Sequence, residues 1–330
     1  MPSVTVFGAA GYTGALSAKL LHRHPSFDLT AVTARSDVGR RLDDLYPQHR
    51  VPLVLEQLDL DRHAAVEAAV VAYPHGAAAE LVTQLRLRGV RVVDLSADFR
   101  LRAVGLYEEW YRVHPKPALI AESVYGLPEL YRDQIRGADL VANPGCYPTA
   151  TLLALGPLAR AGLIQDAVID AKSGVSGAGR TATESTHFVT ADENITPYGV
   201  PRHRHTPEIE QELAAMGADV TITFTAHLLP LDQGELVSCY VTAPDAQHTD
   251  LEALYRAEYE CEPFIELVSR PPGVRDVRET NICRISVHRD VRTARVIVFA
   301  VIDNLWKGAA SQAVQNLNLM FGLPEGEGIS

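Results

Sequence analysis

The residues with the clearest chemical potential lie in the segment 143–149, Asn-Pro-Gly-Cys-Tyr-Pro-Thr. An apolar run that ends at Ala142 is typical of a buried strand, and residues 149–158 have helical character. Asn-Pro-Gly favours a tight turn, so we expect Cys146 close to the N-terminus of a helix. Free N–H groups and the helix dipole favour the thiolate there. Cys146 is therefore the candidate nucleophile, and a small buried residue is the alternative.

The glycines Gly8, Gly11 and Gly14 form a second motif. They follow a short apolar strand at residues 3–7, and a helix-like pattern and a second strand come after them, which together predict a βαβ unit. In this context the glycines allow a tight turn and a close approach of a pyrophosphate to a helix N-terminus. A strand–helix turn without a ligand is the alternative. The predicted dinucleotide contacts in this loop are Gly8, Gly11, Tyr12, Thr13 and Gly14.

The end of the second strand indicates which dinucleotide is bound. Proteins that use NAD carry an acidic residue there for the ribose 2′-hydroxyl. This chain has Arg35 and Ser36 instead, with Arg40 and Arg41 close behind. A guanidinium and a hydroxyl suit a 2′-phosphate, so we predict NADP, with Arg35 as an ordinary surface residue as the alternative.

A nicotinamide cofactor together with a cysteine nucleophile narrows the chemistry. Thiolate attack on an aldehyde gives a thiohemiacetal, and loss of hydride leaves a thioester. In the reverse direction an acyl phosphate acylates the cysteine, phosphate departs, and the thioester is reduced to an aldehyde. Both directions need an acid or base beside the sulfur, donors for an oxyanion, and an anion site for phosphate.

Two histidines are candidates for the acid or base. His203 and His205 flank Arg204 directly before a helix-like run at residues 208–216. Imidazole exchanges protons near neutral pH, as this reaction requires. We favour His205 as the acid–base and His203 as an orienting or substrate-contacting residue, although the residues themselves leave the order open. Solvated surface histidines are the alternative.

Several segments are suited to binding anions. Asp98 and Arg100 follow the C-terminus of a strand, and Arg100 is placed to hold an acyl phosphate with Asp98 orienting it; a structural Asp–Arg pair is the alternative. The glycine-rich loop 173–180 is a second candidate. Further along, Asn304 is a candidate donor to the nicotinamide amide and Lys307 to a carboxylate or phosphate, and helix capping is the rival interpretation for both.

Composition limits the class of protein. The chain has 330 residues, 47% of them hydrophobic, and a net charge of −11, which disfavours nucleic acid or an anionic membrane as partner. Its four cysteines are widely spaced, so neither a disulfide framework nor a metal site is predicted. No signal segment and no apolar run of about 20 residues is present. We expect a cytoplasmic protein.

The pattern of elements predicts an α/β fold with two domains. Up to residue 145, short apolar strands alternate with helices, which indicates a doubly wound, mostly parallel sheet; one helix is expected over residues 61–69. After residue 149 the strands are longer and alternate, as in mixed or antiparallel sheets covered by helices. We expect a Rossmann domain at 1–145 plus 304–330 and a catalytic, substrate and oligomerisation domain at 146–303. Cys146 then falls at the junction of the two.

Several motifs, in this order along the chain, resemble one known family. They are Gly8-x-x-Gly-x-x-Gly, Pro74-His-Gly, Asp94-Leu-Ser-Ala-Asp-Phe-Arg, Asn143-Pro-Gly-Cys-Tyr-Pro-Thr, His203-Arg-His-Thr-Pro-Glu and Asp303-Asn-Leu-Trp-Lys-Gly. The chain is similar over nearly its whole length to the N-acetyl-gamma-glutamyl-phosphate reductases of arginine biosynthesis, relatives of aspartate-semialdehyde dehydrogenase. The resemblance implies an NADP-binding Rossmann domain, a glyceraldehyde-phosphate-dehydrogenase-like α+β domain, and a homodimer or homotetramer.

The resemblance also implies roles for single residues. The nucleophile of the family maps onto Cys146 and its acid–base histidine onto the His203 motif, with His205 favoured. Its nicotinamide-side loops map onto Pro74, His75, Gly76, Ser176, Gly177, Gly179 and Asn304. The candidates for reading the substrate carboxylate, chosen without the resemblance, are Arg112, Arg202 and Lys307.

The expected activity is therefore reduction of N-acetyl-glutamyl 5-phosphate, a small-molecule acyl phosphate, by NADPH. A sister enzyme of lysine biosynthesis that reduces a longer or carrier-bound acyl phosphate is the nearest alternative; its cysteine lacks the flanking Asn-Pro-Gly and Tyr-Pro, and the acidic balance of this chain gives an acidic carrier little attraction. A phosphate-independent aldehyde dehydrogenase and a non-catalytic NADP(H) sensor are the others.

Overall fold

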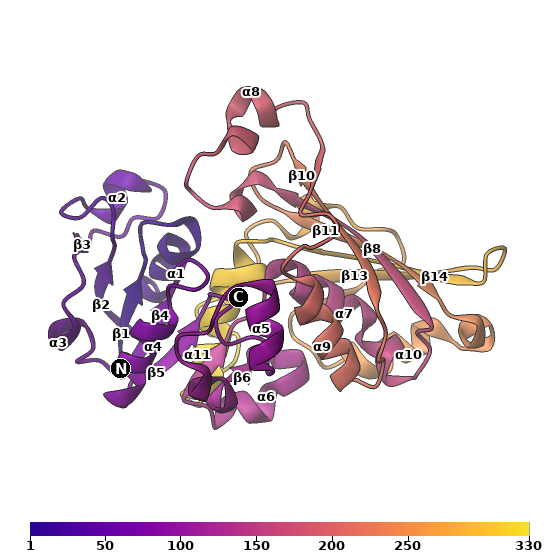
Figure 1. Cartoon of the computed structure of the whole chain (residues 1–330), viewed down its shortest axis with the longest axis horizontal. Helices are drawn as coiled ribbons and strands as arrows, with labels where there is room; N and C mark the ends of the chain where they lie inside the picture. Colours follow the sequence, from indigo (N-terminus) through magenta and orange to yellow (C-terminus); the bar gives the residue numbers. More distant parts are fainter. Residues whose placement is uncertain (330) are drawn as a thin grey trace. The chain divides into compact units, whose positions relative to one another are not determined.

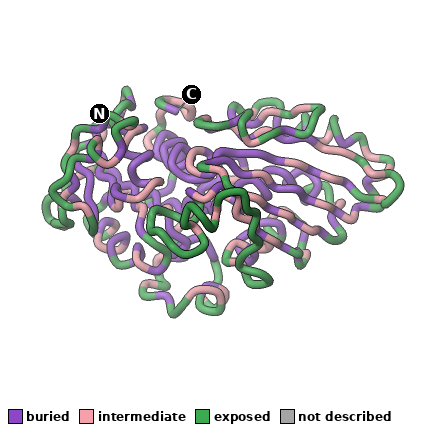
Figure 2. The backbone as a smooth tube through the Cα atoms, turned by 90° about the horizontal axis from the view of Figure 1, so that it is seen from above, coloured by how far each residue is buried: buried purple, intermediate pink, exposed green. Residues whose placement is uncertain are grey.

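The structure is a computed structural model that describes residues 1–329, and the chain forms two compact units (Figure 1). The first contains Met1–Gly145 together with the chain from Ala309 onward, and the second contains Cys146–Gly308. Asn304 and Lys307 thus belong to the second unit. Figure 2 shows buried backbone in the interior of each unit, and along most strands of the second unit buried and partly exposed residues alternate.

The first unit is built on a parallel sheet with the strand order β3-β2-β1-β4-β5-β7-β6. Its strands are β1 (Ser3–Phe7), β2 (Asp28–Thr33), β3 (Leu55–Glu56), β4 (Ala68–Val71), β5 (Arg91–Asp94), β6 (Val124–Tyr125) and β7 (Leu140–Ala142). The central β4 is buried at every residue, as expected for a strand covered by helices on both faces. This is the Rossmann-type arrangement that the sequence predicts.

Helices cover this parallel sheet. They are α1 (Tyr12–His22), α2 (Leu42–Leu45), α3 (Leu60–His63), α4 (Ala79–Leu87), α5 (Val104–Trp110), α6 (Pro128–Arg136) and α11 (Ser311–Met320). The C-terminal α11 packs against α1, α6 and β5. On α4, Leu81, Val82 and Leu85 join Phe7 and Val92 in one core. The sheet edge at the carboxyl ends of β1, β2 and β4 is therefore held rigidly from both helical layers.

The helix expected over residues 61–69 is wrong beyond its first turn. α3 ends at His63, and Ala68 already begins β4. Asp59 starts the short helix, because its side chain accepts from the N–H groups of Asp61 and Arg62. Ala68 and Ala69 belong instead to a buried strand between β1 and β5, where long-range pairing overrides the helix propensity of alanine.

The second unit contains a mixed sheet with the order β12-β13-β14-β11-β8-β10-β9. Its strands are β8 (Asp166–Gly174), β9 (Thr196–Tyr198), β10 (Ile222–Leu229), β11 (Glu235–Thr242), β12 (Ile265–Leu267), β13 (Cys283–Asp290) and β14 (Arg295–Ile302). β11 pairs antiparallel with both β8 and β14, whereas β8 pairs parallel with β10. The parallel pair arises because the chain leaves β8 and returns to β10 through α9 (Thr206–Ala215), a crossover connection.

The helices of the second unit lie along one face of this sheet (Figure 1). They are α7 (Cys146–Arg160), α9 and α10 (Leu251–Tyr259), whereas the short α8 (Phe188–Ala191) lies in a segment exposed to solvent. α7 is the central helix, because it packs on α9, β11 and β14. Nearly all of its side chains are buried, which fixes the position of its N-terminus and hence of Cys146.

The described residues contain no membrane-spanning helix and no cluster of metal ligands. No helix within residues 1–329 is long and apolar enough to cross a membrane. In the same residues no group of three or more His, Cys, Asp or Glu side chains is arranged to hold a metal ion. None of the cysteines at 146, 239, 261 and 283 forms a disulfide bond.

Candidate active site

Cys146 is the first residue of α7. It is half-buried, so its sulfur is neither sealed in the core nor fully solvated. Gly308 approaches it so closely that a Cβ on Gly308 would stand 2.8 Å from the Cβ of Cys146. The placement at a helix N-terminus agrees with the sequence analysis and supplies the electrostatic setting that favours a thiolate.

The residue next to the cysteine, Tyr147, brings both histidines to this helix end. Its ring centroid lies 5.7 Å from that of His203 and 5.8 Å from that of His205, edge-to-face in both cases. Its hydroxyl accepts a 3.2 Å hydrogen bond from Tyr198 of β9 and donates to the carbonyl of His227 at 3.4 Å. The structure thus gathers the predicted nucleophile and both predicted histidines within one unit.

The two histidines differ in their surroundings. His203 is packed between the rings of Tyr147, Tyr198 and Phe224. Burial, together with the positive charge of Arg204, lowers the pKa of His203 to about 4. Its Nδ1 accepts a 3.2 Å hydrogen bond from the backbone N–H of His205. A neutral His203 that orients the turn carrying His205 leaves His205 as the better candidate for proton transfer.

Sequence reasoning missed Glu235, the first residue of β11. Its side chain is fully buried, and within the described residues neither carboxylate oxygen has a hydrogen-bond partner of ordinary geometry. Burial raises the pKa of Glu235 to about 8, and proximity to the Cys146 thiol partly opposes this. The available signal was an acidic residue at the start of an otherwise apolar strand, directly after a glycine.

Asn304, Gly234 and Ser176 form a hydrogen-bonded corner close to Glu235. The Oδ1 of Asn304 accepts a 2.7 Å hydrogen bond from the N–H of Gly234, and its Nδ2 donates to Ser176 Oγ at 3.0 Å. Gly177 lies on the same corner, because a Cβ there would stand 3.1 Å from Ser173 Oγ. Gly179 follows with a φ of +88°, a conformation that suits glycine. The predicted loop at residues 176–179 and Asn304 are therefore in direct contact.

The position of Lys307 does not suit a residue that binds the substrate carboxylate. Its side chain is fully buried, and its Nζ is 5.8 Å from the centroid of the Phe264 ring. It belongs to the π-helical turn Trp306–Ala310, which packs it inward. Arg202, the other candidate in this unit, is exposed next to the histidine turn.

The glycine loop of the first unit is shaped for a close ligand. Gly8 has a φ of +88°, and a Cβ on it would stand 2.5 Å from the carbonyl oxygen of Ala72. A Cβ on Gly14 would collide with the backbone of Gly8. Gly11 precedes the first turn of α1, which contains Tyr12 and Thr13 and has no acidic side chain. These features fit a pyrophosphate on the N-terminus of α1.

The end of β2 presents the predicted 2′-phosphate residues. Arg35 and Ser36 are both exposed. The guanidinium of Arg35 lies over the ring of Tyr73, 4.7 Å from its centroid, which holds the side chain in place. Arg40 pairs with Asp37 at 3.1 Å and Arg41 with Asp43 at 2.7 Å, so both already have acidic partners.

Asp98 organises the loop that contains Pro74, His75 and Gly76. Its buried carboxylate accepts from the N–H groups of Gly76, Ala78 and Ala79, the last two at 3.1 Å each, and from the hydroxyl of Tyr107 at 3.0 Å. It therefore caps the N-terminus of α4. His75 is exposed and accepts at Nδ1 from the N–H of Ala97 at 3.0 Å. This places Asp98 in the support of the predicted nicotinamide loop.

The two arginine candidates of the first unit differ in exposure. Arg100 is buried, and it donates to the carbonyls of Asn143 and Leu95 at 2.8 Å each. It thereby supports the turn that leads to Cys146. Arg112 is exposed, and its guanidinium occupies the space next to Gly76 that a side chain would fill.

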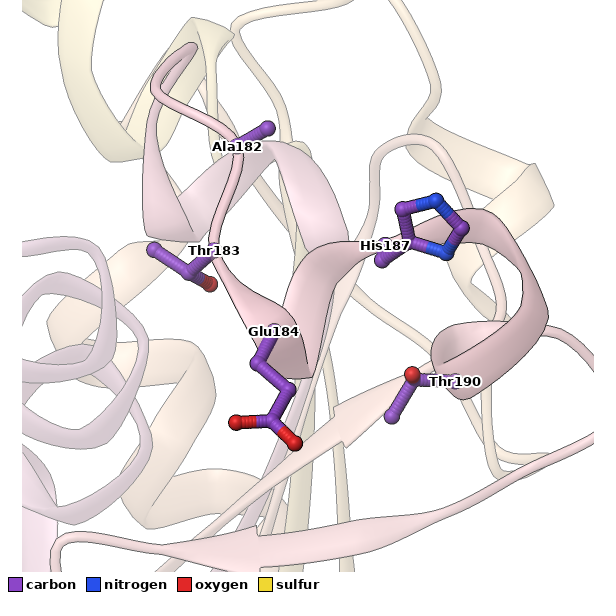
Figure 3. Close-up of a pocket in the computed structure, with 5 residues that line it drawn as sticks. All are labelled: Ala182, Thr183, Glu184, His187 and Thr190. Carbon is purple, nitrogen blue, oxygen red and sulfur yellow. The ribbon is translucent and has the colours of Figure 1, made fainter.

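A separate hollow lies on the exposed segment before α8. Ala182, Thr183, Glu184, His187 and Thr190 line it (Figure 3). None of them is a predicted site residue, and all five are solvent-exposed. The chemistry-bearing residues described above lie outside this hollow.

Comparison with known proteins adds to this geometry. The chain is 48% identical to an N-acetyl-gamma-glutamyl-phosphate reductase of Moorella thermoacetica, covering 97% of this chain and 95% of that protein. It is 47% identical to the enzyme of the same name from Desulforudis audaxviator, covering 100% and 98%. The chain belongs to the N-acetyl-gamma-glutamyl-phosphate reductase family.

Membership in this family agrees with the two units. Residues 3–138 match the NAD-binding domain of the semialdehyde dehydrogenases, and residues 146–304 match their dimerisation domain. The fold is also that of aspartate semialdehyde dehydrogenase II from Vibrio cholerae, with a TM-score of 0.76 at 20% identity over 98% of each chain. This reductase-family chain is thus an oxidoreductase with a nicotinamide-dinucleotide domain and a dimerisation domain.

Proposed function

We propose that the chain catalyses the NADPH-dependent reduction of N-acetyl-L-glutamyl 5-phosphate to N-acetyl-L-glutamate 5-semialdehyde and phosphate, a step of arginine biosynthesis. The observation that carries the proposal is the grouping of a half-buried Cys146 at a helix N-terminus with two histidines held by Tyr147. Relatives that share nearly half of its residues carry the name of this activity.

The residues of the second unit account for the covalent step. The sulfur of Cys146 forms a bond to the acyl carbon while the bond from that carbon to the phosphate oxygen breaks. The bound nicotinamide supplies the hydride that reduces the resulting thioester. The proton that the reaction takes up is exchanged with solvent by His205. His203 is not suited to this, because burial keeps it neutral. Ser176 and Asn304 hold the neighbouring loop in shape.

The finer cofactor assignment is NADP. Arg35 and Ser36 stand exposed at the end of β2, and Tyr73 fixes the guanidinium of Arg35. A 2′-phosphate gains a charge-assisted hydrogen bond from such a group, whereas the neutral 2′-hydroxyl of NAD can form only a weaker one. Gly8, Gly11 and Gly14 would hold the pyrophosphate, and Pro74 to Gly76 the nicotinamide side.

Roles for the remaining polar residues follow from their exposure. Exposed Arg112 and Arg202 are the better candidates for reading the substrate carboxylate, because Lys307 is fully buried. Arg100 supports the turn before Cys146 and is the candidate for contact with the acyl phosphate. The dimerisation domain supports a homo-oligomer, which we propose to be a homodimer or homotetramer.

The test is the variant Cys146→Ser. It should lose turnover of N-acetyl-glutamyl phosphate and keep NADPH binding, because the residues predicted to hold the pyrophosphate and the 2′-phosphate lie in the other unit. Rapid mixing of the wild type with acyl phosphate alone should release about one phosphate per active site. Near-normal turnover by the serine variant would contradict the proposal. Steady-state rates with this substrate, the one-carbon-longer acyl phosphate and the carrier-bound acyl phosphate identify the substrate. In the reverse direction, oxidation of the semialdehyde should require added phosphate.

A further inference from the structure

We propose that Glu235 is a catalytic residue that holds the proton of the Cys146 sulfur, accepting it when the sulfur attacks and returning it when the sulfur leaves. This inference rests on the proposed thioester reaction. It assigns a role to a carboxyl group that the chemistry above leaves unused.

The position of Glu235 is fixed by its strand. It opposes Ser173 on β8 and Ile302 on β14, so it lies in the middle of the sheet at the end nearest Cys146. The preceding Gly234 is anchored to Asn304. The carboxyl group therefore has little freedom to reach water or another donor.

Burial makes this carboxyl group costly for folding. Its side chain is fully buried, and within residues 1–329 neither oxygen has an ordinary hydrogen-bond partner. A buried polar group without a partner costs free energy, and such groups concentrate at functional sites. The group next to it is the Cys146 thiol, the reacting atom of the proposed mechanism.

The groups around Glu235 set the protonation of its carboxyl. Cys146 and Tyr147 face it from α7, Tyr198 from β9, and Asp303 from the turn after β14. Asp303 accepts from three backbone N–H groups and adds negative charge nearby. The tyrosines stay protonated. Burial and the negative charge of Asp303 keep a proton on the carboxyl of Glu235 up to about pH 8, so near neutral pH its ionised fraction accepts the thiol proton and its protonated form returns one.

The proton and the electrons balance in each half of the reaction. In the first, the thiol proton moves to Glu235, the C–S bond forms, and phosphate leaves with the electron pair of the broken C–O bond and takes a solvent proton through His205. In the second, the acyl carbon of the thioester gains the hydride that the bound nicotinamide supplies, the resulting thiohemiacetal oxyanion collapses, the C–S bond breaks, and sulfur keeps its electron pair. Glu235 then returns the proton to sulfur.

Alkylation of Cys146 by iodoacetamide tests this pairing without substrate or cofactor. The measurement uses the full chain with Cys261→Ser, since Cys261 is exposed, and the labelled peptide of Cys146 is quantified by mass spectrometry between pH 5 and 10. We expect E235Q to alkylate at least about tenfold more slowly at pH 7 and to match the wild type at pH 10, because only release to solvent then yields the thiolate. E235D should recover part of the rate at pH 7.

The control variant is E210Q, which changes another carboxyl group whose pKa is raised by burial but which bonds to the N–H of Ile222. Its alkylation profile should follow that of the wild type. Superimposable profiles for E235Q and the wild type would overturn the proposal, as would an unchanged kcat in E235Q. If the wild type failed to reduce N-acetyl-glutamyl phosphate, the proposed function would fail, whereas the alkylation profile would still decide whether Glu235 and Cys146 exchange a proton.

Discussion

The backbone N–H of Gly234 and the side-chain oxygen of Asn304 are joined by a buried 2.7 Å hydrogen bond. Through this bond, Asn304 fixes the start of β11, the strand that carries Glu235. The same amide holds Ser176 with its nitrogen. One side chain thus ties together the loop after β8, the start of β11 and the turn after β14.

Asn304→Ala should destabilise this corner and slow the reaction. The N–H of Gly234 would lose its acceptor in a buried place, which costs about 1–3 kcal/mol. We expect a lower midpoint of thermal unfolding and a lower kcat. Ser176→Ala removes only the partner of the amide nitrogen and should have the smaller effect. Equal stability of N304A and the wild type would show that the corner contributes nothing.

Arg35→Ala should weaken the binding of NADP and leave that of NAD unchanged. A hydrogen bond to a charged group contributes about 1.5–3 kcal/mol, so the Kd for NADPH should rise about 10- to 100-fold. Isothermal titration with both cofactors measures the change. Arg40→Ala is the matched control, because Arg40 is already paired with Asp37. A similar loss in both variants would point to general electrostatics instead of a 2′-phosphate site.

The features that the sequence predicts well are local. The glycine loop sits between β1 and α1, and Cys146 begins α7, because tight turns, apolar runs and glycine positions act over a few residues. The parallel and mixed sheets follow from the change in strand pattern. These signals need no knowledge of distant contacts.

The features that the sequence did not reveal depend on distant pairing. Glu235 meets Cys146 only because β11 lies beside β14 and under α7. The burial of Lys307 results from packing against Phe264, and the early end of α3 results from pairing of β4 with its neighbours. Residue type alone gave Lys307 a substrate role that its burial disfavours.

Replacing each of the two histidines in turn should separate their roles. H205N should lower kcat by about 10²–10⁴-fold, the range for loss of a general acid–base. H203N should lose less, since burial lowers the pKa of His203 to about 4 and keeps it neutral during turnover. The pH profile of kcat near neutrality should therefore survive in H203N and disappear in H205N. The opposite pattern would assign proton transfer to His203.

Asp98→Asn should disturb the loop at Pro74 to Gly76. The amide nitrogen cannot accept from the N–H groups of Ala78 and Ala79, so part of the helix cap on α4 is lost. We expect a thermal midpoint several degrees lower and a higher Kd for the dinucleotide. Asp133→Asn, at an exposed residue paired with Arg136, is the control. Unchanged cofactor binding in D98N would separate this loop from the dinucleotide site.

The titration of Glu235 should appear in the stability of the protein. Burial raises its pKa from 4.5 to about 8, so between these values the folded chain holds a proton that the unfolded chain releases. Its contribution to stability is therefore present below pH 4.5 and is lost as the pH rises through 8.

Replacing the acid by E235Q removes this loss. The stability of the variant relative to the wild type should rise from pH 5 to pH 9, by an amount on the order of a few kcal/mol, since each pKa unit corresponds to about 1.4 kcal/mol. Thermal midpoints at pH 5, 7 and 9 measure the difference. E266Q, which removes a partly exposed carboxyl group paired with Arg284, should show no such trend. Parallel curves for E235Q and the wild type would mean that Glu235 titrates normally, which would also remove the physical basis for proton exchange with Cys146.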